Sequence, residues 1–95
     1  MLFAKKIKQL REELQIPQRQ LASALEIDTP MYSKIERGER PAKRKQIPFI
    51  ANLLKTDEDI LVTLWLADKI ITAIGDEEEF AAQAWGIVQQ AIKQG

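Results

Sequence analysis

The side chains that could do chemistry in this sequence are basic and short polar groups. There is no histidine and no cysteine, which removes the commonest general base, the commonest zinc ligands and any disulfide. Two serines, four threonines, one tyrosine, lysines and carboxylates remain, and the four glycines form no phosphate-binding motif. The three consecutive acidic side chains of residues 77–79 would point in different directions on a helix, so we expect no cation site there. We expect no enzyme, no metal site and no cofactor.

Charge is divided unevenly between the two halves of the chain. Residues 1–55 hold seven Lys and five Arg against one Asp and five Glu, a net charge of +6. Residues 56–95 hold two Lys against four Asp and four Glu, a net charge of −6. A basic surface attracts nucleic acid and an acidic one repels it, so the first half is expected to face a polyanion. Chance placement of solvated charges is the alternative.

The elements that must position these charges are all helical. Phe3, Ile7, Leu10 and Leu14 recur at helical spacing and predict a first helix. A short second helix is expected over residues 18–25, and a third over residues 29–37, capped by Asp28 or Thr29 and ended by Gly38.

The remaining chain predicts three more helices and no strands. A fourth begins at residue 45 or 46, with Pro48 in its first turn, and ends near residue 54. Thr56 with Asp59, and Asp76 with Glu79, resemble capping boxes and are expected to open a fifth and a sixth helix. The fold class expected is all-α, a bundle of five to six helices with residues 1–55 and 56–95 as two regions of one compact domain.

Two short helices joined by a tight turn, the second flanked by basic residues, are what a helix-turn-helix DNA reader requires. The stretch Gln18-Arg19-Gln20-Leu21-Ala22, then Ile27, then Tyr32-Ser33-Lys34-Ile35-Glu36-Arg37-Gly38-Glu39-Arg40-Pro41, resembles the XRE family, which includes Cro and phage repressors. The resemblance covers about residues 3–55, and its Ser-Lys-Ile-Glu-Arg-Gly pattern is specific.

The resemblance implies that the third helix reads bases in the major groove of double-stranded DNA. Thr29, Ser33 and Lys34 are the expected readers, since Lys34 can donate to guanine N7 and O6 and Thr29 can touch a thymine methyl. Pro30 offers only apolar contact, and helix initiation explains it equally well. A solvated helix face is the alternative for the other three.

Phosphate contacts are implied at the start of the second helix and around the third. Gln18 matches the family position where a helix N-terminus meets a phosphate. The basic residues expected to add phosphate contacts are Arg19, Arg37, Arg40, Lys43, Arg44 and Lys45.

Two matched positions are expected to be structural. In relatives the residues equivalent to Arg11 and Glu36 form a partly buried ion pair between the first and third helices. A departure occurs in the turn, where the family often has glycine and this chain has Glu26, so either a residue with a side chain accepts the turn geometry or the turn differs slightly.

The acidic half carries more apolar surface than one core can cover. Eleven of the fifteen residues from Ile60 to Ile74 are apolar, and the sixth helix has two adjacent apolar stripes. We expect a homodimer interface, with the alternative that both helices cover the protomer's own core. The expected interface residues are Leu61, Leu64, Trp65, Ile71, Phe80, Trp85, Val88 and Ile92.

We expect a soluble, cytoplasmic protein, and the resemblance implies that it is a regulator that binds a palindromic operator as a homodimer. Small members of this kind, including controllers of restriction-modification operons, often act on their own promoters. The longest uncharged run, Phe80 to Ile92, has 13 residues and is too short to span a membrane. We expect no small-molecule effector. The alternative is an antitoxin or other protein-binding module whose C-terminal helices bind a partner protein.

Overall fold

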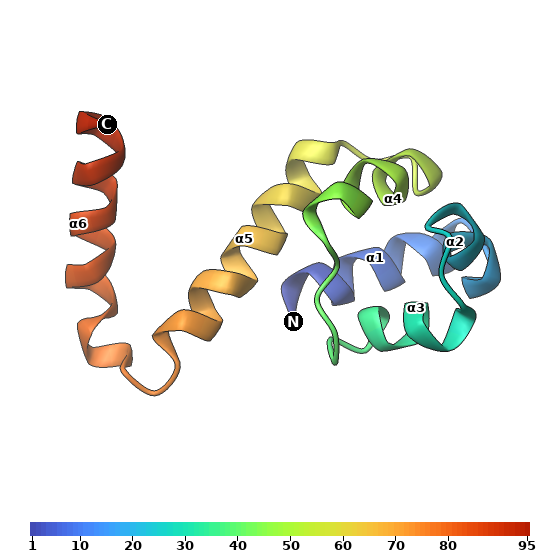
Figure 1. Ribbon diagram of the computed structural model, residues 1–95, viewed down its shortest axis with the longest axis horizontal. Coiled ribbons are helices and arrows are strands. Elements are labelled where there is room, and N and C mark those ends of the chain that lie inside the picture. Colours follow the sequence, from blue (N-terminus) through green and yellow to red (C-terminus); the bar gives the residue numbers. More distant parts are fainter.

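A computed structural model describes residues 1–95 and shows six α-helices and two short 3₁₀ helices without strands, so the all-α prediction is confirmed (Figure 1). The helices are α1 (Leu2–Glu13), α2 (Gln18–Ala24), α3 (Thr29–Glu36), α4 (Ile47–Leu53), α5 (Glu58–Ile74) and α6 (Ala81–Gln94). The 3₁₀ turns η1 (Arg44–Gln46) and η2 (Glu78–Phe80) precede α4 and α6.

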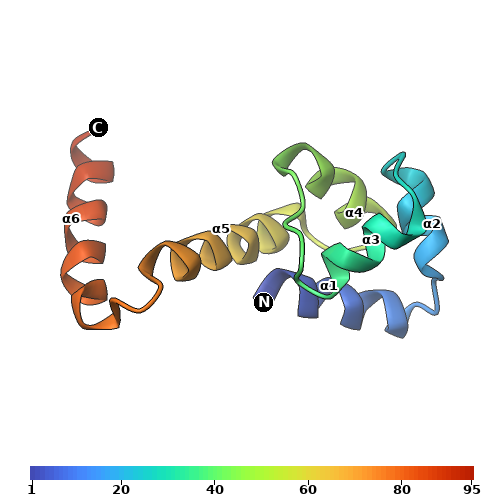
Figure 2. The ribbon, with the colours of Figure 1, turned by 60° about the horizontal axis from the view of Figure 1, so that its bottom comes forward.

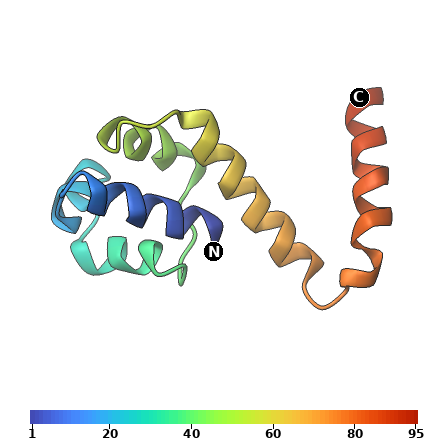
Figure 3. The ribbon, with the colours of Figure 1, turned by 180° about the vertical axis from the view of Figure 1, so that it is seen from behind.

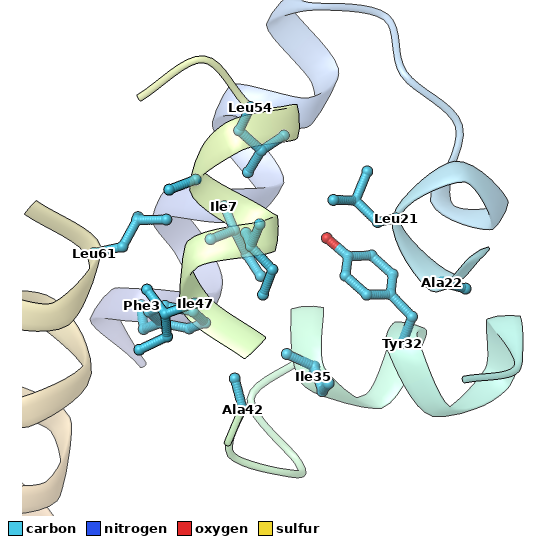
Figure 4. Packing of buried hydrophobic residues seen from close by; sticks show 12 residues of the cluster. Phe3, Ile7, Leu21, Ala22, Tyr32, Ile35, Ala42, Ile47, Leu54 and Leu61 are labelled. Carbon is cyan, nitrogen blue, oxygen red and sulfur yellow. The ribbon is translucent and has the colours of Figure 1, made fainter. Parts of the chain in front are cut away.

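The hydrophobic core lies between α1, α2, α3, α4 and the first turn of α5. Figure 4 shows the side chains of Ile7, Leu21, Tyr32 and Leu54 in one cluster, and they come from α1, α2, α3 and the C-cap of α4. Leu61 of α5 is fully buried in the same cluster. The core therefore includes the beginning of α5 as well as residues 1–55.

Local chemistry explains where α3 begins and how the turn before it bends. The Asp28 side chain accepts a hydrogen bond from the backbone N–H of Met31 at 2.7 Å, which makes Asp28 the N-cap and leaves Pro30 in the first turn. Glu26 has φ of +58°, so it takes the left-handed conformation that the family usually gives to glycine. The expected departure in the turn is confirmed: a residue with a side chain adopts the geometry, at a cost on the order of 1 kcal/mol.

The predicted caps of the last two helices are wrong. Asp57, not Thr56, caps α5, because its carboxylate accepts from the N–H of Asp59. The helix at the C-terminus begins at Ala81, and Phe80, which has no side-chain hydrogen bond, is its N-cap. The segment of Asp76 to Glu79 forms a turn and η2 instead, so its acidic residues lie ahead of α6.

A buried carboxylate fastens α5 to the start of α1. Both oxygens of Asp68 accept backbone hydrogen bonds, from Leu2 at 2.8 Å and from Phe3 at 2.9 Å. These N–H groups have no partner within α1, and a negative charge is favourable at a helix N-terminus. Nearby, the indole of Trp65 donates to the carbonyl of Ala42 at 2.7 Å. These long-range bonds fix the direction in which α5 leaves the core.

The sixth helix does not join the bundle. Figures 1, 2 and 3 show α6 (red) separated from α1–α4 by the length of α5. The radius of gyration is 15.2 Å, larger than the roughly 12 Å of a compact chain of this length. Five helices therefore form the packed unit, which agrees with the expected bundle of five to six helices.

Candidate nucleic-acid interface

The helix α3 is held by packing on one side and is open to solvent on the other. Tyr32 and Ile35 are buried against α1 and α2, whereas Thr29, Pro30 and Lys34 are exposed and Ser33 is partly exposed. This division follows the helical period, because residues three and four apart share a face. The structure thus brings the four expected base-reading residues together on the open side of α3.

An ion pair between α1 and α3 holds the open helix in place. The guanidinium of Arg11 donates from Nε and Nη2 to the two carboxylate oxygens of Glu36, at 2.6 and 3.0 Å. The side chains are 14% and 2% exposed, respectively. Arg11 also donates from Nη1 to the carbonyl of Ile16 at 2.9 Å, so it ties α3 to the segment before α2. The predicted pairing of these residues is confirmed.

The environment of this pair shifts its protonation equilibria. Burial alone would raise the pKa of Glu36, but hydrogen bonds from Arg11 and Gln18 and the positive charge of Arg11 more than offset it and hold the pKa below its usual value. The same hydrogen bond raises the pKa of Arg11. Burial and the nearby carboxylate raise the pKa of Tyr32, whose buried hydroxyl has no hydrogen-bond partner. All three groups therefore keep one protonation state at neutral pH.

Gln18 has a second role that the sequence did not predict. Its side-chain amide donates from Nε2 to Glu36 Oε1 at 3.1 Å, which connects the first residue of α2 to the last residue of α3. The backbone N–H groups of Gln18 and Arg19 lie in the first turn of α2 and have no partner within the helix. Because the side-chain amide of Gln18 is bonded to Glu36, its backbone N–H is the group that is free to donate to the expected phosphate.

The basic residues expected to contact phosphates are exposed but do not all lie together. Arg37 and Arg40 are at the C-terminal end of α3, where the N–H of Arg40 bonds to the carbonyl of Lys34. Arg37 pairs with Glu39 and donates to the hydroxyl of Ser33 at 2.6 Å. This pairing raises the pKa of Arg37 and lowers that of Glu39. Arg37 can bind a phosphate only if it breaks its ion pair with Glu39 or contacts Glu39 and the phosphate at the same time.

The other basic residues expected to contact phosphates lie on α2 and at η1. Arg44 lies 3.7 Å from Glu58 at the start of α5, so its charge is partly satisfied within the protomer. Lys43 directly precedes η1 and Lys45 lies on it; both are exposed, as is Arg19 on α2. None of these last three residues forms an ion pair.

Three of the residues predicted for a dimer interface pack within the protomer. Leu61 is fully buried in the core, which makes its assignment wrong. Leu64 and Trp65 are partly buried against the core, and the ammonium of Lys69 lies 4.5 Å from the centre of the Trp65 ring. The others remain exposed: Ile71 by 54%, Phe80 by 52%, Trp85 by 45%, Val88 by 43% and Ile92 by 70%.

Comparison with known proteins agrees with this geometry. A family model described as helix-turn-helix matches residues 7–61, from the middle of α1 to the first turn of α5. No curated protein and no solved structure matches the chain. No helix is long and apolar enough to cross a membrane.

Proposed function

Because this chain belongs to the helix-turn-helix family of XRE type, whose members are DNA-binding transcriptional regulators and not enzymes, we propose that it binds a palindromic operator as a homodimer. The observation that supports this most is the open face of α3, where Thr29 and Lys34 are exposed and Ser33 is partly exposed, while Arg11 and Glu36 fix the helix behind them. Pro30 shares this face. The first turn of α2 and the basic residues around α3 would meet phosphates.

The homodimer is supported by the exposed apolar side chains of α6. One recognition helix reads only a few base pairs, whereas two related by a twofold axis reach successive major grooves about 34 Å apart. Regulators of this kind commonly act on their own promoters, and we propose the same here. Control of a restriction-modification operon is one form that such autoregulation takes.

The proposal is tested by fluorescence anisotropy of the protein on DNA from upstream of its own gene and on a scrambled duplex, each at two salt concentrations. If a dimer neutralises about eight phosphates, log K falls with log salt with a slope of roughly −7 on both duplexes. The upstream DNA is expected to bind about a thousandfold tighter. Equal affinity for both would refute autoregulation, and no binding at low salt would favour a module that binds a partner protein.

Substitutions separate base reading from phosphate binding. Lys34→Ala is expected to weaken binding to the upstream DNA by about tenfold to a hundredfold, because it removes a donor to a base edge, while binding to the scrambled duplex changes little. Lys45→Ala is the matched control: it removes the same charge from a phosphate-contacting position and should weaken binding to both duplexes alike. Anisotropy titrations on both duplexes measure the two ratios. Equal losses for Lys34→Ala on both would show that Lys34 does not read a base.

A further inference from the structure

The helix α6 is exposed along almost its whole length. Every residue from Ala82 to Gly95 is exposed, and Ala81 is the one partly buried residue of the helix. Its most exposed large side chains are Ile87, at 72%, and Ile92, at 70%. Between Glu79 and Lys93 the helix carries no charge. Such a surface is unstable in water unless another apolar surface covers it.

A groove separates α6 from the end of α5. It has a volume of about 340 Å³, and eight of its nine lining residues are hydrophobic. Ile70, Ala73 and Ile74 line the α5 side, and Ala84, Trp85 and Val88 line the α6 side. Figures 1 and 3 show the two helices diverging from the turn that joins them. The small alanine side chains of the groove leave room for a helix to approach closely.

The connection between the two helices holds the groove open. The N–H of Glu77 bonds to the carbonyl of Ile74 at 3.0 Å, and the N–H of Phe80 bonds to the carbonyl of Glu77 at 3.1 Å. Gly75 has φ of 54° and ψ of −125°, a conformation that favours glycine. The hydrogen bonds of this turn and the conformation of Gly75 set the direction of α6. With this orientation, α6 does not fill the groove between itself and α5.

The helix presents two apolar faces about 100° apart, and only part of each face lines its own groove. Trp85 and Val88 belong to the first face, together with Ala81. The second face contains Phe80 and Ala84, which line the groove near the turn, and Ile87 and Ala91, which lie outside the groove lining and are exposed. A helix with two adjacent apolar faces is suited to contact two other helices at once.

We propose that each α6 enters the groove of a second copy of this chain, so that the two protomers exchange their last helices. In this dimer the first faces of the two α6 helices pack against each other across the twofold axis. The Ile87 face of each packs on Ile70, Ala73 and Ile74 of the other copy, which is why the helix carries no charge there. This inference rests on the proposed homodimer and names the surfaces that form it.

The absence of cysteine from the chain allows a direct test by disulfide crosslinking. Two variants, Ala73→Cys and Ile87→Cys, are mixed, equilibrated and oxidised, then separated on a denaturing gel without reductant. Exchange predicts a covalent dimer in the mixture and far less in either variant alone. The double variant Ala73→Cys with Ile87→Cys is expected to crosslink between chains, not within one. The matched control pairs Ala73→Cys with Gln89→Cys, an exposed position about 160° around α6 from Ile87, and should give little product.

Light scattering of the unmodified chain measures its oligomeric state, which distinguishes a failure of the proposed helix exchange from a failure of the proposed homodimer. A dimer in solution whose double variant crosslinks within one chain would overturn the exchange, because α6 would then lie on its own α5, and would leave the homodimer intact. A dimer that gives no product in the mixture would also overturn it. A monomer at all concentrations would refute the homodimer itself. A dimer together with the mixed crosslink would support both.

Discussion

Arg11→Ala is expected to lower the free energy of unfolding by about 3 kcal/mol, measured by urea denaturation at neutral pH. The substitution leaves the Glu36 carboxylate, 2% exposed, without the guanidinium that donates to both of its oxygens. It also leaves the carbonyl of Ile16 without a donor. The large loss of stability comes mainly from leaving the buried charge of Glu36 unpaired, and less from losing its attraction to Arg11.

The control is Arg19→Ala, which removes the same charge from an exposed position on α2 and should change stability by less than about 0.5 kcal/mol. Glu36→Ala alone should cost about as much as Arg11→Ala. Because the two residues act as a unit, the double variant should lose clearly less than the sum of the two single losses. Additive losses, or an Arg11→Ala variant as stable as the parent, would show that the pair does not hold α3.

The same pair makes stability depend on pH in a defined direction. The pKa of Glu36 is lowered in the folded chain, so its contribution is fully present above the pKa of the unfolded carboxyl. That contribution is lost as the pH falls through the lower pKa of the folded state. The stability difference between the parent and Glu36→Gln should therefore shrink below about pH 4.

The sequence predicted the helices that read DNA more accurately than those at the C-terminus. Periodicity placed α1, α2 and α3 to within one or two residues, because each has a single buried face and α3 has a local cap at Asp28. The caps of α5 and α6 were misplaced. For α5 the reason is that Thr56 and Asp57 are adjacent residues and either side chain can cap a helix. The backbone geometry, not the pattern, selects between them.

Contacts between distant residues were outside the reach of the sequence. The bonds from Asp68 to the start of α1 join residues 65 or more positions apart. The same limit explains why Leu61 was assigned to a dimer surface: counting apolar residues on α5 shows that more than one side is apolar, but not which side meets the chain's own core. Gln18 was correctly placed at the start of α2, yet its bond to Glu36 depends on how two helices pack.

Charging the groove face of α6 is expected to convert the protein into a monomer and to weaken binding to its upstream DNA by about a hundredfold or more. The variant is Trp85→Asp with Val88→Asp, two exposed side chains on the helix that lies apart from α1–α4. Since α6 lies outside the core, thermal unfolding of the helix-turn-helix unit should be unchanged. Each half-site is then bound separately, without the gain that linkage gives the second contact.

The readouts are light scattering for the oligomeric state and anisotropy for DNA, with a matched control that adds equal charge. Ala82→Asp with Gln90→Asp places two carboxylates on the exposed side of α6 that faces away from both apolar faces, so repulsion of DNA is the same while those faces stay intact. The control should remain a dimer and keep most of its affinity. In the monomer the slope of log K against log salt should fall to about half, because one protomer contacts about four phosphates. A monomer that kept the full slope and affinity would show that operator binding does not require the second protomer.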